Sequence, residues 1–349
     1  MYLVYGINFL LAISTTIGMT MVPFLVTDSL GLSLMVLGLM EGTTEFLSNL
    51  FRLVNGVLFD KIKNKRAIFV CSTGMAFASK ALLLIPNPWT VLFSKTLERI
   101  SNGTFASPRD AYVAEKAVNK GIALGILSVT KTAGCVLGPL VVSISTIFLG
   151  SLNENLNFFV VLCCILVFPT IIFSGFLNVS GVETSKFSLQ EFNVIFKKLT
   201  PILLIVFLFF LGRFNDGLLM IHLKQKGFPE WFYLSTIAIF NFIMLMTSPV
   251  IGSQIDRGGI KKMLYLTIVS LGIFDVCFYQ IGNAGWIYAG IGLVAWGIQR
   301  TGAQIVFASL VFKSVPKANY GTAIGIYYIV SGTGNMLAAF VAGSILYKG

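Results

Sequence analysis

Long apolar segments separated by short polar connections recur along the whole chain. A helix needs about 20 apolar residues to cross the hydrocarbon core of a bilayer, and each of these segments reaches that length. We therefore expect an all-α integral membrane protein. Windows bounded by charged residues, Gly and Pro place about eleven spans. The expected spans are 3–27, 34–59, 67–86, 89–114, 121–149, 156–178, 200–222, 231–255, 262–281, 285–312 and 320–347.

The composition agrees with a chain that lies in lipid. Hydrophobic residues make up 56% of the sequence and charged residues 11%, whereas soluble domains carry about a quarter charged residues. The connections are short except for 179–199, so little chain lies outside the bilayer to build a soluble active site. We expect no enzyme, but an N-terminal six-helix bundle at 1–178, a cytoplasmic linker at 179–199 and a C-terminal bundle at 200–349 with five visible spans and its sixth absent.

Basic residues are distributed unequally between the two ends of the spans. The connections on the side of the N-terminus hold most of those outside the spans, whereas the other side holds Lys224, Lys226 and Lys348. Lys and Arg accumulate in cytoplasmic loops, so we expect the N-terminus in the cytoplasm and the protein in a bacterial inner (plasma) membrane. The net charge of +11 is spread over short connections and forms no continuous stripe, so we expect no nucleic-acid partner.

Histidine and cysteine usage excludes most metal and disulfide chemistry. His222 is the single histidine, and the five cysteines all lie in apolar segments without a Cys-x-x-Cys pair. We expect no metal and no cofactor.

The two halves carry the same pattern where their second spans end. Each has Gly-x-x-x-Asp followed by basic residues. The residues concerned are Gly56, Asp60, Lys61 and Arg66 in the first half, and Gly252, Asp256 and Arg257 in the second. Further along, Arg99 matches Arg300 at nearly the same offset. Parallel repeats of this kind are typical of transporters whose solute site lies between the halves.

On these residues the chain resembles the major facilitator superfamily over essentially its whole length. The repeated Gly-x-x-x-Asp-Lys/Arg signature is that family's best marker. Three further stretches resemble family motifs: Arg99–Gly103 the fourth-span motif of proton-coupled members, Pro108-Arg109-Asp110-Ala111 a prokaryotic branch, and Gly134–Pro139 a fifth-span motif of antiporters. Lys131 stands where this branch usually has an acid. The resemblance implies a two-bundle fold with parallel repeats and about twelve spans.

Span two carries a polar stripe along one helical face. Glu41, Glu45, Asn49 and Arg52 follow i, i+4, i+8 and i+11 spacing. Charged side chains near the bilayer centre cost about 3 kcal/mol each, so they pair or face an aqueous cavity. Glu45, near mid-depth, is a candidate proton acceptor because a low dielectric favours the neutral acid. The alternative is a permanent ion pair with a neighbouring span.

Span four adds Glu98, Arg99 and Asn102. Glu98 and Arg99 are adjacent, so their side chains diverge around the helix and need different partners. Arg99 fills the position of the family's coupling arginine. The candidate proton-coupling residues are Glu41, Glu45, Glu98 and Arg99. Structural ion pairing is the alternative for Glu98 and Arg99.

Spans seven and ten complete the predicted solute site with Arg213, Asp216, Gln299 and Arg300. Lys95, Arg99, Arg213 and Arg300 are basic residues on helices expected to line the cavity, which favours an anionic or zwitterionic solute. The predicted substrate-binding residues are Asn49, Arg52, Asn102, Arg213, Asp216, Gln299 and Arg300. We interpret Lys80 and Asp275, on helices that usually face lipid, as structural.

The repeated motif also predicts an inward gate. Asp60 and Asp256 are expected to accept hydrogen bonds at a helix N-terminus, and Gly56 and Gly252 to allow close backbone approach. The alternative is a local loop cap. The predicted gating residues are Gly56, Asp60, Lys61, Arg66, Arg109, Asp110, Gly134, Gly138, Pro139, Gly252, Asp256 and Arg257.

These features favour a monomeric secondary transporter that moves a small solute, such as a metabolite, siderophore or drug, by alternating access. Its partners are the solute, protons and the lipid bilayer. Two alternatives stay open: an uncoupled facilitator or lipid carrier, and a non-transporting membrane receptor or scaffold.

Overall fold

The computed structural model describes residues 1–61, 65–116, 120–177, 189–281, 285–316 and 320–348. Some side chains near the helix ends, among them those of 52–61, are outside this description. Within the described residues every regular element is helical, as the sequence predicts. The elements of the first half are α1 (Tyr2–Phe24), η1 (Leu25–Ser29, a π-helical turn), α2 (Leu34–Lys61), α3 (Lys65–Leu82), α4 (Pro88–Lys116), α5 (Lys120–Leu149) and α6 (Leu156–Gly175).

The second half contains a helix break that the sequence reading treats as continuous helix. Its elements are α7 (Leu189–Leu211), α8 (Asp216–Gln225), α9 (Glu230–Asp256), α10 (Ile260–Tyr279), α11 (Gly285–Ser314) and α12 (Tyr320–Lys348). The chain leaves the helix between α7 and α8, inside the expected span 200–222. Asn215 caps α8, because its Oδ1 accepts a hydrogen bond from the Gly217 amide at 2.8 Å. The helix α7 also starts at Leu189, inside the stretch expected as a linker.

Seven helical stretches of the described chain are apolar and long enough to cross a membrane. They comprise α1 with η1, α5, α6, α7 with α8, α9, α10 and α12. The described parts of α2, α3, α4 and α11 do not meet this criterion. Several of their polar side chains, such as Lys80, Glu98 and Gln299, are buried against other helices instead of facing lipid.

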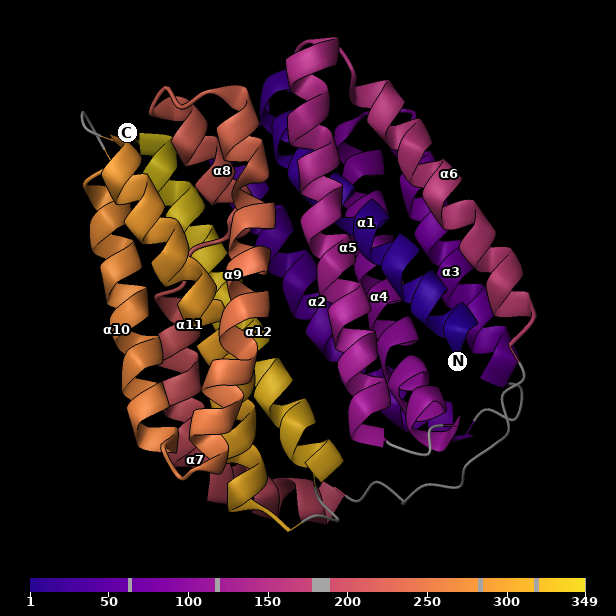
Figure 1. The fold of residues 1–349 in the computed structure, drawn as a ribbon, viewed down its shortest axis with the longest axis vertical. Helices are drawn as coiled ribbons and strands as arrows, with labels where there is room; N and C mark the ends of the chain where they lie inside the picture. Colours follow the sequence, from indigo (N-terminus) through magenta and orange to yellow (C-terminus); the bar gives the residue numbers. More distant parts are fainter. Residues whose placement is uncertain (62–64, 117–119, 178–188, 282–284, 317–319, 349) are drawn as a thin grey trace.

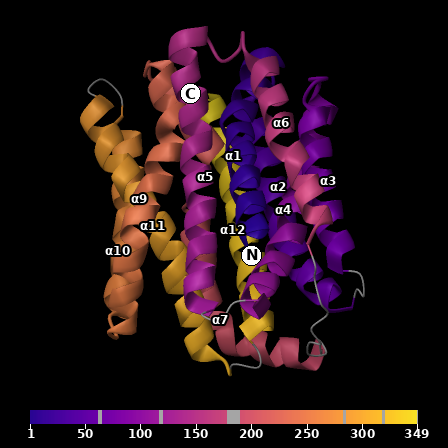
Figure 2. The same cartoon turned by 45° about the vertical axis from the view of Figure 1, so that its right-hand side comes forward.

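Figure 1 shows α1–α6 on one side of the molecule and α7–α12 on the other, and Figure 2 shows the same arrangement turned by 45°. Helices α3, α6 and α10 contribute no described residue to the central cavity. We call the face where α1 begins and α2 ends the N-terminal face, and the face where α8 ends and α9 begins the opposite face. The halves meet along two helix pairs, α2 with α12 and α5 with α9.

The two halves are closed against each other at the opposite face. An added Cβ at Gly42 would lie 2.8 Å from the Met336 carbonyl oxygen, so α2 and α12 approach each other backbone to backbone. Ser143 Oγ donates to the Trp231 carbonyl at 2.5 Å, and Asp28 pairs with Lys224. Close packing and polar links therefore seal this end of the interface.

Within the first half, α5 packs closely on α1 through glycines. An added Cβ at Gly138 would lie 2.7 Å from Ile13 O and 3.2 Å from Ile17 N, and one at Gly134 would lie 2.8 Å from Phe9 O. Backbone atoms cannot move aside as a flexible side chain can. These two glycines are therefore packing residues in this conformation.

We expect Gly138→Ala to lower the free energy of unfolding by about 1–3 kcal/mol, because the methyl group overpacks the α1 backbone. Gly125→Ala is the matched control on the same helix, since nothing lies within 4 Å of its added Cβ. That control should gain about 0.5–1 kcal/mol from helix propensity. Thermal unfolding in detergent checks both, and equal shifts for the two variants would contradict the packing role.

Candidate functional site

A cavity of about 370 Å³ lies between the two halves. It extends from Met19 and Gly217, at mid-depth, to Asn8 and Arg109, which are nearer the N-terminal face. Its size is at the lower end of typical small-molecule sites. Since the opposite face is sealed, this conformation presents the cavity to the N-terminal face.

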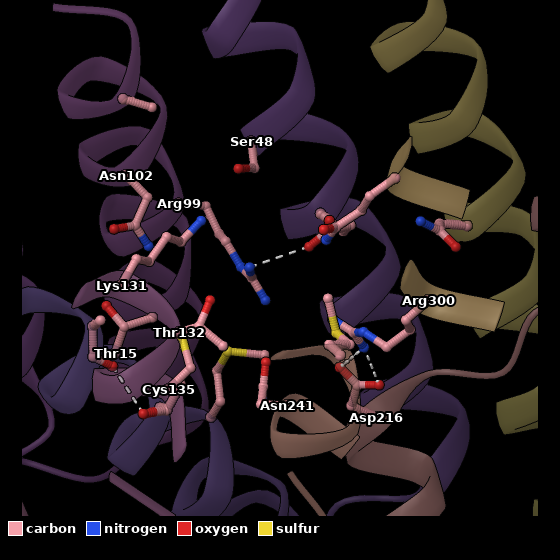
Figure 3. Close-up of a pocket in the computed structure, with 18 of the residues that line it drawn as sticks. Thr15, Ser48, Arg99, Asn102, Lys131, Thr132, Cys135, Asp216, Asn241 and Arg300 are labelled. Carbon is pink, nitrogen blue, oxygen red and sulfur yellow. Dashed lines mark hydrogen bonds and ion pairs between the residues drawn. The ribbon is translucent and has the colours of Figure 1, made fainter. Parts of the chain in front are cut away.

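The wall from the first half carries a network of paired charges. Glu41 pairs with Lys95, and Arg99 Nη1 lies 3.1 Å from Glu45 Oε2. Arg99 Nη2 is 4.0 Å from Glu41 Oε2, so Arg99 connects the two glutamates. Figure 3 shows Arg99 reaching toward the centre of the cavity, and its dashed line marks this ion pairing. The side chain of Glu45 is 34% exposed and that of Glu41 6%, so Glu45 is the carboxylate that meets cavity water.

The wall from the second half is built around the helix break. Asp216 accepts from Arg300 Nη1 at 2.5 Å and from Trp296 Nε1 at 3.2 Å. Figure 3 shows Asp216 directly beside Arg300. Arg213, in the unwound segment, lies over the Trp296 ring at 5.4 Å and the Phe210 ring at 5.7 Å from their centroids. Cation–π contacts thus hold its guanidinium in place.

Glu98, predicted for proton coupling, lies away from the cavity. It pairs with Lys80 of α3, and both side chains are buried. The Lys80 ammonium packs directly against Gly18 of α1. The residue Lys80 therefore faces the interior of the first half and not lipid. The adjacent residues Glu98 and Arg99 have different partners.

Two predicted substrate-binding residues do not line the cavity, and the side chain of a third lies outside the description. Asn49 is buried under Gly332 of α12, and Ser48 lines the cavity in its place. Gln299 is fully buried, and neither of its side-chain polar atoms has a hydrogen-bond partner among the described residues. The side chain of Arg52 lies outside the description. Asn102 does line the cavity.

The predicted gating residues fall into separate places. Arg109 lines the cavity mouth, donates to Asn8 Oδ1 at 2.7 Å and pairs with Asp110 at 2.8 Å. Pro139 lies inside α5 next to Gly138. Gly56 and the side chains of Asp60 and Lys61 are outside the description. Arg66, Asp256 and Arg257 are exposed. An added Cβ at Gly252 would meet nothing within 4 Å. That these residues close the cavity at the N-terminal face in another conformation stays a prediction.

The cavity also contains polar residues that the sequence reading did not place there. They come from α1, α5, α9 and α12 and include Asn8, Thr132, Cys135, Asn241 and Asn335. Lys131, whose sequence position was unexpected, lines the same wall as Cys135. Asparagines inside apolar spans were the available signal, because an uncharged amide also needs partners or water at mid-depth.

This arrangement defines a membrane carrier of small solutes: a polar, water-accessible cavity between two helical halves, sealed at one face. Within the described residues no group of three or more His, Cys, Asp or Glu could hold a metal ion. Residues 4–339 match the sequence profile of the Major Facilitator Superfamily, so the chain belongs to this family.

Known proteins of similar sequence or structure are transporters. The chain is 26% identical, over 98% of its length and 87% of the relative's, to an uncharacterised MFS-type transporter of Methanocaldococcus jannaschii. Among solved structures, the nucleoside transporter NupG matches with a TM-score of 0.80 at 15% identity, covering 99% of this chain and 91% of that one. A human organic anion transporter, MFSD10, matches with a TM-score of 0.69 at 16% identity, covering 99% and 93%. At these identities the structural likeness concerns the fold.

The Lys80–Glu98 pair yields a stability prediction. Glu98→Gln leaves the buried Lys80 ammonium without its counter-charge, and we expect it to lower the free energy of unfolding by about 3–5 kcal/mol. The double variant Lys80→Met with Glu98→Leu should recover most of that loss, because an apolar pair of similar volume replaces a buried ion pair at little cost. Thermal unfolding in detergent measures both. A stable single variant would show that the pair does not hold this bundle together.

Proposed function

We propose that this protein is a proton-coupled secondary transporter that moves a small anionic or zwitterionic solute by alternating access. The observation that carries the proposal is the ion pair between Glu45 and Arg99 on the wall of the central cavity. Glu45 is the exposed carboxylate of a charged network, so it can exchange a proton with cavity water while its partner stays charged.

The charge of the cavity supports the solute class. Among the described residues its lining holds more basic than acidic side chains. The basic ones are Arg99, Arg109, Lys131, Arg213 and Arg300, and the acidic ones are Glu41, Glu45 and Asp216. An anionic group on the solute offsets the surplus, and the carboxylates give a zwitterion's ammonium group a partner.

The basic residues of the connections support an orientation with the N-terminal face in the cytoplasm. The cavity in this conformation then opens inward. Transport requires a second state in which the contacts of α2 with α12 and of α5 with α9 separate, and the cavity is presented to the opposite face. The gate residues around Asp60 and Asp256 are our candidates for sealing the inward side in that state.

A ligand screen followed by reconstitution tests the function. A metabolite that binds the native state stabilises it by an amount that grows with the logarithm of ligand concentration over Kd, and this identifies a solute. Uptake of that solute into proteoliposomes should then accelerate under an imposed pH gradient. Counterflow without any pH dependence would instead favour a facilitator. A protein that binds no solute and keeps one conformation would favour a receptor or scaffold.

Cys135 gives an independent test of alternating access, because it lines the cavity. In a variant whose other cysteines are replaced by alanine, a charged thiol reagent should modify Cys135 faster from the N-terminal face than from the opposite face. Addition of the solute should change the two rates in opposite directions. Labelling in oriented vesicles measures both rates, and equal labelling from both faces would contradict a closed opposite face.

A further inference from the structure

Glu45 stands between two arginines that belong to different halves of the protein. Arg99 of α4 holds it at 3.1 Å. Across the cavity, Arg213 of the unwound segment lies on the wall formed by the second half, and the Glu45 carboxylate is among the charges that act on its guanidinium. The carboxylate thus lies where the two halves face each other.

The other acids near these arginines are already engaged. Asp216 accepts hydrogen bonds from Arg300 and Trp296, and Glu41 pairs with Lys95. The Arg213 Nε atom is buried and has no hydrogen-bond partner among the described residues. Arg99 and Arg213 are therefore the two arginines of the cavity wall for which an entering anion can compete with Glu45.

We propose that the solute is a small organic monocarboxylate, and that its carboxylate takes the place of the Glu45 carboxylate between Arg99 and Arg213 once Glu45 is protonated. This inference rests on the proposed function and specifies its solute and its coupling. A carboxylate is the group of choice because the site already accommodates one, with the right charge and with oxygens suited to guanidinium donors.

The surroundings of Glu45 single it out as the group that takes the proton. Helix α4 provides Arg99, which pairs with Glu45, and Lys95, which pairs with Glu41. The start of α8 provides Asp216, which pairs with Arg300. On its own helix Glu41 is buried behind Lys95. Helix α12, which packs along α2, carries no charged residue between 323 and 344. Glu45 is thus the acid in this group with the most access to water.

Charge balance then predicts electroneutral symport. In the empty form the group of Glu45, Arg99 and Arg213 has one net positive charge. With a proton on Glu45 and a bound monoanion its net charge is the same. The protein therefore crosses between its two states with an unchanged charge in the low-dielectric region, whether loaded or empty, and one proton accompanies each monoanion. A solute that bridges Arg99 and Arg213 also draws the halves together.

The proton also sets the affinity for the anion. While Glu45 is ionised, its carboxylate occupies Arg99, and the carboxylate of the solute can bind to Arg213 only. After protonation the solute gains a charge-assisted hydrogen bond to Arg99, which corresponds to about a ten- to hundredfold higher affinity. The affinity for carboxylates should accordingly fall as the pH rises through the titration of Glu45.

The experiment uses monocarboxylates from acetate to benzoate, each beside its neutral amide, as probes of the purified full-length protein. Binding is measured by thermal shift between pH 5 and pH 8. Carboxylates should bind better than their amides, with an affinity that falls about ten- to a hundredfold over this range in the wild type. In Glu45→Gln the affinity should stay high and independent of pH. Asp275→Asn, a matched acid-to-amide change outside the cavity, should keep the wild-type pH dependence.

A transport measurement with the wild type alone completes the test and needs no variant to fold. Uptake of the best-bound carboxylate into proteoliposomes should respond to a pH gradient and not to an imposed potassium diffusion potential. Uptake driven by membrane potential, or a Glu45→Gln variant that keeps the wild-type pH dependence, would overturn the inference. Binding of amides as tightly as carboxylates would do the same.

Failure of this inference and failure of the proposed function give different results. If neutral or cationic solutes are bound and carried under a pH gradient while no carboxylate is, the monocarboxylate site is wrong and proton-coupled transport stands. If no solute of any charge is carried, the proposed function fails as well. Arg213→Gln separates the site further, since it should weaken carboxylate binding at every pH without changing the binding of amides.

Discussion

The free-energy cost of a charged side chain at the middle of a bilayer determines how this structure is organised. Each ionised group there needs a counter-charge, hydrogen bonds or water. The first half meets this requirement with complete pairs, Lys80 with Glu98, Lys95 with Glu41, and Arg99 with Glu45. Around the helix break the second half has two arginines for the acid Asp216, and aromatic rings support the cations. The cavity wall of the second half therefore has one more basic than acidic side chain.

The break between α7 and α8 is what brings that charge to the cavity. An unbroken helix would satisfy the backbone but would leave no bend at mid-depth. Residues 212–215 are non-helical, and 213–215 line the cavity. A water-accessible cavity is the environment in which irregular backbone is tolerated inside a membrane. The Asn215 cap replaces one of the hydrogen bonds lost at the start of α8. Arg213 within the break and Asp216 directly after it then reach the cavity.

Hydropathy was sufficient to predict the helical class and most spans, because the hydrocarbon thickness fixes how long an apolar segment has to be. The repeat correctly pointed to Arg99 and Arg300 as cavity residues. The prediction that Asn49 lines the cavity was wrong, because the helical period turns its side chain away. Relative to Glu41, residue i+8 is rotated by about 80° around the helix and residue i+7 by about 20° in the other direction. Asn49 therefore faces α12, and Ser48 lines the cavity.

The sequence also did not predict which residues form ion pairs with each other. The sequence shows that Glu98 needs a counter-charge but not that Lys80 of the neighbouring helix supplies it, because this pairing depends on how α3 and α4 pack. The break in span seven was overlooked for a different reason. A hydropathy window averages over the segment, so a short polar run such as 212–217 is outweighed by the apolar residues around it, even though its Asn and Gly residues are typical of helix caps and turns.

The distribution of the ion pairs between the halves explains how such a molecule can change conformation at moderate cost. Among the described residues, the ion pairs in the membrane interior each join helices of the same half, so a movement of one half against the other leaves them intact. The pair that crosses between the halves, Asp28 with Lys224, lies at the opposite face, where water can replace it. The close approach of α2 to α12 uses glycines. Rocking therefore breaks contacts that water can replace, while the four ion pairs within the halves keep their partners.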